Sequence, residues 1–163
     1  RPPVCCSIVD PTFPAGSILR SLPSGSYMES NLRHAALTWT GGLRFRGGAP
    51  DGPTVTLDGD GEAGPSPMVS LLLALGSCTG ADVVCTLEKM RVELRDCRIE
   101  VTGTRKADCP KRYTAITLGF HLAGAGLDET KARRAIDLSL EKYCSVAASL
   151  APDVSISYQL VLG

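Results

Sequence analysis

The residues of this sequence that are best suited to chemistry are its cysteines. The 163-residue chain has seven cysteines but only two histidines. A cysteine thiolate is a nucleophile that oxidants convert to a sulfenic acid, and a second thiol turns this acid into a disulfide. Two of the seven, Cys78 and Cys144, lie in sequence contexts that set them apart from the others.

Cys78 lies in the run Gly76-Ser77-Cys78-Thr79-Gly80, inside a long apolar stretch. Its small neighbours leave room around the sulfur for a substrate. A free cysteine is more often a small buried hydrophobic residue, so the local sequence leaves both interpretations of Cys78 open. For Cys85, on the apolar stretch, and Cys97, in a predicted strand, we expect the buried hydrophobic role.

Cys144 lies where one predicted helix ends and another begins. The free N–H groups at the start of a helix stabilise a nearby thiolate. Cys78 cannot form a disulfide with Cys85, because seven helical residues separate Cα atoms by about 10 Å and a disulfide needs about 7 Å or less. A partner for Cys78 must therefore come from elsewhere in the fold.

Other common functional classes lack support in the sequence. His34 and His121 are the only histidines and no Cys-x-x-Cys pair occurs, so we expect no metal site and no cofactor. No Gly-x-Gly-x-x-Gly, P-loop, Gly-x-Ser-x-Gly or His-Glu-x-x-His motif is present. An odd number of irregularly spaced cysteines favours a reducing, cytoplasmic environment over a disulfide framework.

The composition is that of an ordinary globular protein, with 44% hydrophobic residues. The chain has 17 basic residues (lysine and arginine) and 17 acidic residues (aspartate and glutamate). Nothing in its net charge therefore favours binding to nucleic acid or anionic lipid. No uninterrupted apolar run is long enough for a membrane span, and the first residues do not resemble a secretory signal. We therefore expect a cytoplasmic protein that binds neither nucleic acid nor membrane.

The spacing of apolar and turn residues predicts an α+β fold. We expect a hairpin over 32–46 that turns at Gly41-Gly42, and a strand over 53–58. Ser66-Pro67 then opens a helix that runs from Met68 to Met90 and is buried over much of its girth. Next we expect two strands, over 91–103 and 113–122. They are followed by a helix over 129–143 capped by Asp128, a short helix capped by Ser145 and a strand over 154–160. Strands and helices do not alternate one for one, which is typical of α+β proteins.

Residues 1–27 differ from the remainder of the chain. They hold five of the eleven prolines, mixed with serine and glycine, and show no periodicity. The first methionine is Met28. We therefore divide the chain into a proline-rich arm over 1–27, either flexible or added to the natural protein, and one domain over 28–163.

Two separated motifs resemble those of the OsmC/Ohr family. The first comprises Gly64-Pro65-Ser66-Pro67-Met68, the run from Leu71 to Thr79, and Asp82-Val83-Val84. The second comprises Ser139 and Glu141-Lys142-Tyr143-Cys144-Ser145-Val146, in a form similar to that of the YhfA-like branch. The resemblance covers about residues 32–163.

This resemblance implies an intertwined homodimer with antiparallel sheets around two central helices and active sites at the subunit interface. It also implies a peroxidase that reduces organic hydroperoxides without a metal or bound cofactor. In this family the cysteine of the first motif attacks the peroxide and that of the second resolves the product, which correspond to Cys78 and Cys144. A small-molecule or lipoyl-type dithiol would then reduce the resulting disulfide.

The sequence departs from the family pattern at one position. Members of the Ohr branch carry a glutamate directly after the motif proline, where this chain has Met68, and the YhfA-like branch tends to carry it one residue later, where this chain has Val69. A thiolate still needs a nearby cation. The resemblance favours Arg105 for this role over Arg44 and Arg46. The missing carboxylate also keeps an alternative open, a non-catalytic thiol sensor or a binding protein for an apolar small molecule.

Overall fold

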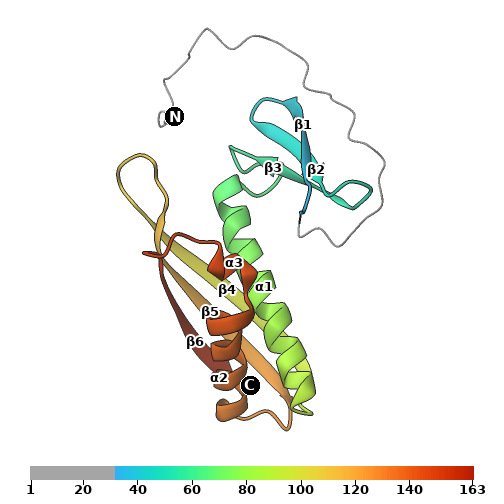
Figure 1. The fold of residues 1–163 in the computed structure, drawn as a ribbon, viewed down its shortest axis with the longest axis vertical. Helices are drawn as coiled ribbons and strands as arrows, with labels where there is room; N and C mark the ends of the chain where they lie inside the picture. The colour runs from blue at the N-terminus through green and yellow to red at the C-terminus, as the bar shows by residue number, and fades with distance from the viewer. Residues whose placement is uncertain (1–31) are drawn as a thin grey trace.

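The computed structural model describes residues 32–163, so the expected arm over 1–27 and the domain start at Met28 lie outside the described residues. The described chain has two parts (Figure 1): a small sheet at one end, and a larger body in which two helices cover one face of a second sheet. This arrangement is the predicted α+β class. The long helix α1 runs from the small sheet along the length of the body.

The small sheet comprises β1 (Ala36–Gly41), β2 (Arg44–Gly48) and β3 (Thr54–Asp58), in that order and antiparallel. The predicted turn at Gly41-Gly42 is confirmed, and both glycines have positive φ, 108° and 57°, which side-chain-bearing residues rarely adopt. One face of this sheet is apolar and faces solvent in the single chain. Its residues are Leu37, Trp39, Phe45, Val55 and Leu57, of which only Leu57 is half-buried.

Helix α1 (Pro67–Lys89) starts as predicted. The Ser66 hydroxyl accepts a hydrogen bond from the N–H of Val69, and Pro67 occupies the first helical turn. The expected burial around its girth is wrong for the single chain, because only one stripe is covered. That stripe consists of Leu75, Gly76, Thr79, Gly80, Val83 and Leu87.

By length and composition alone, α1 would be able to cross a membrane, which corrects the expectation that nothing in the chain has this property. Polar residues interrupt the apolar run of α1, but the helix is apolar on average. The core helix of a soluble protein passes the same test, and α1 packs against β4 and α2. Its composition is therefore weak support for membrane insertion.

The larger sheet has the order β4 (Glu93–Arg105), β5 (Tyr113–Ala125) and β6 (Ser155–Leu162). The pair β4–β5 is antiparallel, but β6 runs parallel to β5. The expectation of purely antiparallel sheets is thus wrong for this pair. The helices between β5 and β6 carry the chain back to the starting end of β5, and such a crossover connection joins parallel strands.

The crossover consists of α2 (Glu129–Leu138), a π-helical turn η1 (Ser139–Tyr143) and α3 (Ser145–Ala148). Asp128 caps α2 as predicted, since its Oδ1 accepts a hydrogen bond of 2.8 Å from the N–H of Lys131. The prediction of one regular helix to residue 143 is wrong, because the last turn widens. The predicted cap of α3 shifts by one residue, from Ser145 to Cys144.

The core lies between the larger sheet and the helices α1 and α2. Alternate residues of β5 supply the sheet side and are 0–1% exposed: Ile116, Leu118, Phe120 and Leu122. Glycines let α1 approach β4 closely, since a Cβ at Gly80 would lie 2.6 Å from Cδ1 of Ile99 and one at Gly76 would lie 2.8 Å from Cγ2 of Val101. The core thereby fixes α1 against the sheet.

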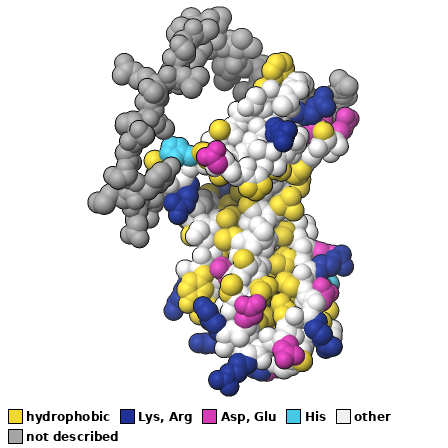
Figure 2. Space-filling model, turned by 90° about the vertical axis from the view of Figure 1, so that its right-hand side faces the viewer, with side chains coloured by type: hydrophobic (Ala, Val, Ile, Leu, Met, Phe, Trp, Pro, Cys, Tyr) yellow, Lys and Arg dark blue, Asp and Glu magenta, His cyan; other side chains and the backbone are white. Residues whose placement is uncertain are grey.

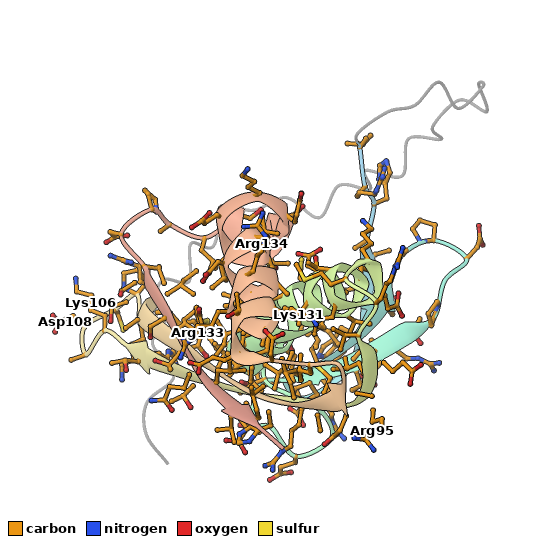
Figure 3. All side chains as sticks on the ribbon, turned by 90° about the horizontal axis from the view of Figure 1, so that it is seen from below. Arg95, Lys106, Asp108, Lys131, Arg133 and Arg134 are labelled. Carbon is orange, nitrogen blue, oxygen red and sulfur yellow. The ribbon has the colours of Figure 1, made fainter. Side chains whose placement is uncertain are left out.

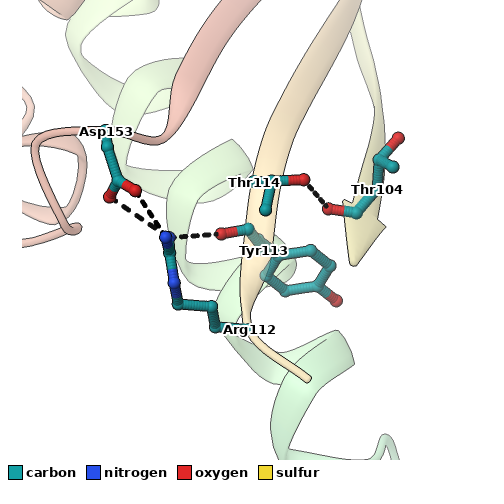
Figure 4. A network of polar contacts seen from close by, with 5 residues as sticks. All are labelled: Thr104, Arg112, Tyr113, Thr114 and Asp153. Atoms are coloured by element: carbon teal, nitrogen blue, oxygen red, sulfur yellow. Dashed lines mark hydrogen bonds and ion pairs between the residues drawn. The ribbon is translucent and has the colours of Figure 1, made fainter. Parts of the chain in front are cut away.

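Charged side chains lie around the edge of the body. Figure 3 shows Lys131, Arg133 and Arg134 on α2, Lys106 and Asp108 on the loop between β4 and β5, and Arg95 on the opposite side. Figure 4 shows Arg112, at the start of β5, paired with Asp153, just before β6, while its guanidinium also donates to the carbonyl of Tyr113 at 3.2 Å. This pair ties the start of β5 to the loop that leads into its parallel neighbour.

Candidate active site

The structure brings Cys78, Cys144 and Asp82 together. The two sulfurs and a carboxylate oxygen of Asp82 all lie within 4.8 Å of one another. Cys78 and Asp82 are one turn apart on α1, so their side chains share a face of the helix. Cys144 comes from the junction of η1 and α3, 66 residues along the chain from Cys78. The cluster therefore joins the two sequence motifs.

The π-helical turn places Cys144. Its N–H donates a hydrogen bond of 2.8 Å to the carbonyl of Ser139, five residues earlier, and this bond closes the wide turn. Single π-helical turns within helices are frequent at functional sites. The Cys144 side chain is 3% exposed, which leaves its sulfur inside the protein and facing α1.

Two polar groups approach the Cys144 sulfur. The N–H of Ala147 lies 3.4 Å from it, and the Thr79 hydroxyl oxygen also lies 3.4 Å from it. The same hydroxyl lies 2.9 Å from the Leu75 carbonyl, to which it donates. A hydroxyl has one proton and two lone pairs, so it can accept from the Cys144 thiol while donating to the carbonyl, or donate to a Cys144 thiolate.

Cys78 is half-buried, and its surroundings act on its charge in opposite directions. A hydrogen bond from the backbone N–H of Val146 lowers its pKa, while burial, the neighbouring Cys144 and the negative charge of Asp82 raise it. The net effect is a pKa above the ordinary thiol value. Two consecutive N–H groups of α3 thus donate to the two sulfurs, that of Val146 to Cys78 and that of Ala147 to Cys144.

Asp82 is held by the second motif. Its Oδ2 accepts a hydrogen bond of 2.8 Å from the Ser139 hydroxyl, which is fully buried. Within residues 32–163, Asp82 takes part in no ion pair. In the sequence, Asp82, Ser139 and Thr79 stood out only as members of the two motifs, with no role of their own. The spacing of four between Cys78 and Asp82 was the available signal.

Arg105 does not join this cluster within the single chain. Its Nε donates a hydrogen bond of 2.6 Å to the carbonyl of Lys111, across the end of the β4–β5 hairpin. The other two candidates belong to the small sheet: Arg46 donates to the Thr54 hydroxyl at 2.9 Å, and Arg44 acts electrostatically on Asp58. The assignment of a cation to Cys78 therefore stays a prediction.

Two other cysteines of the described region, Cys85 and Cys97, are free thiols and lie outside the cluster. Cys97 is half-buried, and burial raises its pKa, with a smaller contribution from Asp96. The expectation that Cys85 is buried is wrong, because it lies on the uncovered side of α1. It is a free thiol on the helix of Cys78, seven residues away.

Two hollows flank α1. One, of about 250 Å³, borders the neighbours of Cys78 and is lined by Leu73, Gly76, Ser77, Cys97, Ile99 and Val101. The other, of about 490 Å³, lies at the start of α1. Its lining is largely apolar and includes Met68, Leu71, Tyr113 and Leu150, together with Arg105, Lys111 and Arg112. Met68, which replaces the family glutamate, thus lines an apolar hollow.

The arrangement can support thiol–disulfide chemistry. The more accessible sulfur, that of Cys78, lies on the long helix, and the buried sulfur of Cys144 has polar groups beside it. A short movement of the two side chains would bring the sulfurs to bonding distance. A carboxylate beside both sulfurs can exchange protons with them.

Comparison with known proteins agrees with the motifs and the fold. The model of the OsmC-like protein family matches residues 59–159. Protein YhfA of Escherichia coli K12 is 41% identical over 130 residues, which cover 78% of this chain and 97% of YhfA.

Solved structures share the fold at lower identity. The OsmC-like protein of Mycoplasma pneumoniae aligns with a TM-score of 0.71 at 18% identity, covering 83% of this chain and 99% of its own. The organic hydroperoxide resistance protein OhrB of Bacillus subtilis aligns with a TM-score of 0.56 at 19% identity, covering 78% and 98%. The chain therefore belongs to the OsmC-like protein family.

Proposed function

We propose that this protein is a thiol-dependent peroxidase that reduces organic hydroperoxides with Cys78 and Cys144. The observation that carries the proposal is the meeting of these two free thiols within 4.8 Å, one half-buried and one buried. Membership of the OsmC-like family supports a peroxide-related role, and one relative of the same fold is named an organic hydroperoxide resistance protein.

In the first step, the Cys78 thiolate attacks the terminal oxygen of the hydroperoxide. The O–O bond breaks, the alkoxide takes a proton and leaves as an alcohol, and Cys78 becomes a sulfenic acid. The proton that Cys78 loses on ionisation has an acceptor in Asp82, whose carboxylate lies within 4.8 Å of the sulfur. The Val146 N–H stabilises the thiolate that remains.

In the second step, the Cys144 sulfur attacks the sulfur of the sulfenic acid. A disulfide forms, and the hydroxyl of the sulfenic acid leaves as water with the proton of the Cys144 thiol. An external dithiol, small or lipoyl-type, then reduces this disulfide by two thiol exchanges and is itself oxidised. The burial of Cys144 suits the resolving role, because it withholds this thiol from direct reaction with peroxide.

The test is turnover of cumene hydroperoxide with a dithiol as reductant. The parent protein and Cys85→Ser should turn over at equal rates, because Cys85 lies outside the cluster. Cys78→Ser should be inactive. In the absence of the dithiol, which would reduce the sulfenic acid directly, Cys144→Ser should consume about one equivalent of peroxide and stop at the sulfenic acid. Activity that survives in Cys78→Ser would overturn the assignment.

A second candidate, a thiol sensor or a binding protein for an apolar small molecule, is favoured by two observations. The pKa of Cys78 is raised, which leaves less thiolate at neutral pH, and Met68 and Val69 stand where the family has a carboxylate. The hollow of about 490 Å³ could receive an apolar ligand. A parent protein that consumes one equivalent of hydroperoxide and does not turn over would favour this candidate.

We also propose a homodimer in the cytoplasm. The support is apolar surface that the single chain leaves uncovered: the apolar face of the small sheet and the outer side of α1, where Val69 is 45% and Leu73 is 57% exposed. Figure 2 shows hydrophobic side chains gathered in a band along the body. A three-stranded sheet with one apolar face is stable when that face packs on another surface. A second chain would also be able to bring an arginine to Cys78.

A further inference from the structure

We propose that the reduced site binds one thiophilic divalent cation, of the Zn²⁺ type, through the two sulfurs of Cys78 and Cys144 and a carboxylate oxygen of Asp82. Within residues 32–163, these three side chains form a group of potential metal ligands. Their ligand atoms all lie within 4.8 Å of one another. Three protein ligands leave a fourth tetrahedral position open to water or another small ligand.

The distances are close to those that a tetrahedral ion requires. With Zn–S bonds of about 2.3 Å and Zn–O bonds of about 2.0 Å, neighbouring ligand atoms lie about 3.5 to 3.8 Å apart. The observed limit of 4.8 Å exceeds this by about 1 Å, which side-chain rotation can supply. Two of the ligands sit one turn apart on α1, so the backbone that carries them is already rigid.

Each ligand has an outer partner that fixes it. The Ser139 hydroxyl holds Oδ2 of Asp82 at 2.8 Å, and the Thr79 hydroxyl and the Ala147 N–H approach the Cys144 sulfur, both at 3.4 Å. The N–H of Val146 serves the Cys78 sulfur. Donors of this kind orient metal-bound thiolates and carboxylates and are a regular feature of protein metal sites.

The charge of the site favours a cation. Ionisation of both thiols beside Asp82 would gather three negative charges, and Asp82 has no ion-pair partner in the described part of the chain. A divalent ion neutralises most of this charge and releases the two thiol protons. Two sulfur ligands select soft or borderline ions such as Zn²⁺ over Mg²⁺ or Ca²⁺, which prefer sites of oxygen alone.

No common zinc signature in the sequence marks this site, because those signatures rely on histidines or Cys-x-x-Cys pairs. Here the pattern is a cysteine followed four residues later by an aspartate, completed by a cysteine from the π-helical turn. The ion would occupy the lone pairs of both sulfurs, so metal binding and oxidation to a disulfide exclude each other. The proposal does not rest on the proposed peroxidase activity, since metal binding is measured without hydroperoxide.

The test is a titration of the reduced, metal-free full-length protein with Zn²⁺ against a chromophoric chelator. We expect the parent and Cys85→Ser to bind the same high-affinity equivalent. Cys78→Ser and Cys144→Ser should each weaken that equivalent by at least about 100-fold, more than the loss of an outer-shell partner costs, and Asp82→Asn by at least about 10-fold. Prior oxidation of the protein to the disulfide should abolish it.

At saturating Co²⁺, the visible spectrum provides a second readout, which reports the ligands rather than the affinity. The parent should give the intense visible bands of a tetrahedral ion and sulfur-to-metal charge transfer from two thiolates, and Cys78→Ser should lose half of that charge transfer. Equal Zn²⁺ affinity in the parent, Cys78→Ser and Cys144→Ser would overturn the proposal. So would a Co²⁺ spectrum without thiolate charge transfer, or a loss of binding in Cys85→Ser alone.

Discussion

The body and the small sheet of this protein differ in how much of their apolar surface a single chain buries. The body has a core of buried apolar side chains, and the hydrogen bonds described for its thiol cluster within residues 32–163 come from nearby residues of the same chain. The small sheet presents Trp39, Phe45 and Val55 to solvent, each more than 40% exposed. The fold of one chain is thus enough to bring Cys78 and Cys144 together, whereas it leaves the apolar face of the small sheet exposed.

The largest expected effect tests the core of the body. Phe120→Ala removes a ring that is 0% exposed and packs edge-on against Tyr158 at 6.3 Å. We expect it to lower the free energy of unfolding by about 3–5 kcal/mol, as measured by urea denaturation. The matched change Phe45→Ala, in the small sheet, should cost less than about 1 kcal/mol at a protein concentration low enough to disfavour association. Equal losses would contradict the division into a complete body and an incomplete sheet.

The second effect tests the apolar face of the small sheet. Trp39 pairs with Phe45 and Phe45 with Leu57 in the register of the three strands, so these side chains share one face. Phe45→Glu would place a charge there, and we expect it to weaken self-association by at least about 10-fold, measured by analytical ultracentrifugation. Thr38→Glu, on the opposite face of β1, is the matched control and should leave the association constant unchanged. A parent protein that is monomeric at all concentrations would contradict the homodimer.

What the sequence predicted depends on whether a feature is set by local or by long-range contacts. The turn at Gly41-Gly42, the Ser66-Pro67 helix start and the alternation of β5 depend on local preferences, and the structure confirms all three. The parallel placement of β6 and the π-helical turn depend on contacts between distant segments, and no local pattern indicated them. Local sequence likewise could not show which side of α1 remains uncovered, because all its sides are apolar.

The candidate site shows the same limit. The motifs indicated Cys78 and Cys144, and the structure places them together. The role of Thr79 did not follow from the sequence, since a threonine on an apolar stripe has the spacing of a core residue. Its link to Cys144 exists only because η1 turns that cysteine toward α1. Arg105 was favoured by the resemblance, but in the single chain its hydrogen bond goes to Lys111.

A smaller effect tests how the body holds Cys144. Thr79→Val keeps the volume of a fully buried side chain but removes the hydroxyl beside the Cys144 sulfur. We expect a loss of about 1 kcal/mol of stability, the net value of one hydrogen bond. Disulfide formation after a single addition of hydroperoxide, followed by rapid quenching, should become slower. Unchanged disulfide formation would show that packing alone positions Cys144. Thr117→Val, at an exposed hydroxyl that contacts Ser157 in the sheet, is the control.

The smallest effect concerns the charge beside Cys78. Asp82 is one of the groups that raise the pKa of Cys78, after burial and the neighbouring Cys144. Asp82→Asn keeps the shape and an oxygen to accept the Ser139 hydroxyl, but removes the negative charge that disfavours the thiolate. The pKa of Cys78 should therefore fall, and the rate of its alkylation by iodoacetamide should rise at a lower pH than in the parent. Alkylation of Cys85, followed by mass spectrometry in the same samples, should keep its pH profile, because Asp82 and Cys85 do not share the cluster. A Cys78 profile that stays in place would mean that burial and Cys144 alone set the acidity of this thiol. A profile that moves to higher pH would mean that the carboxylate acts mainly through the hydrogen bonds of the site.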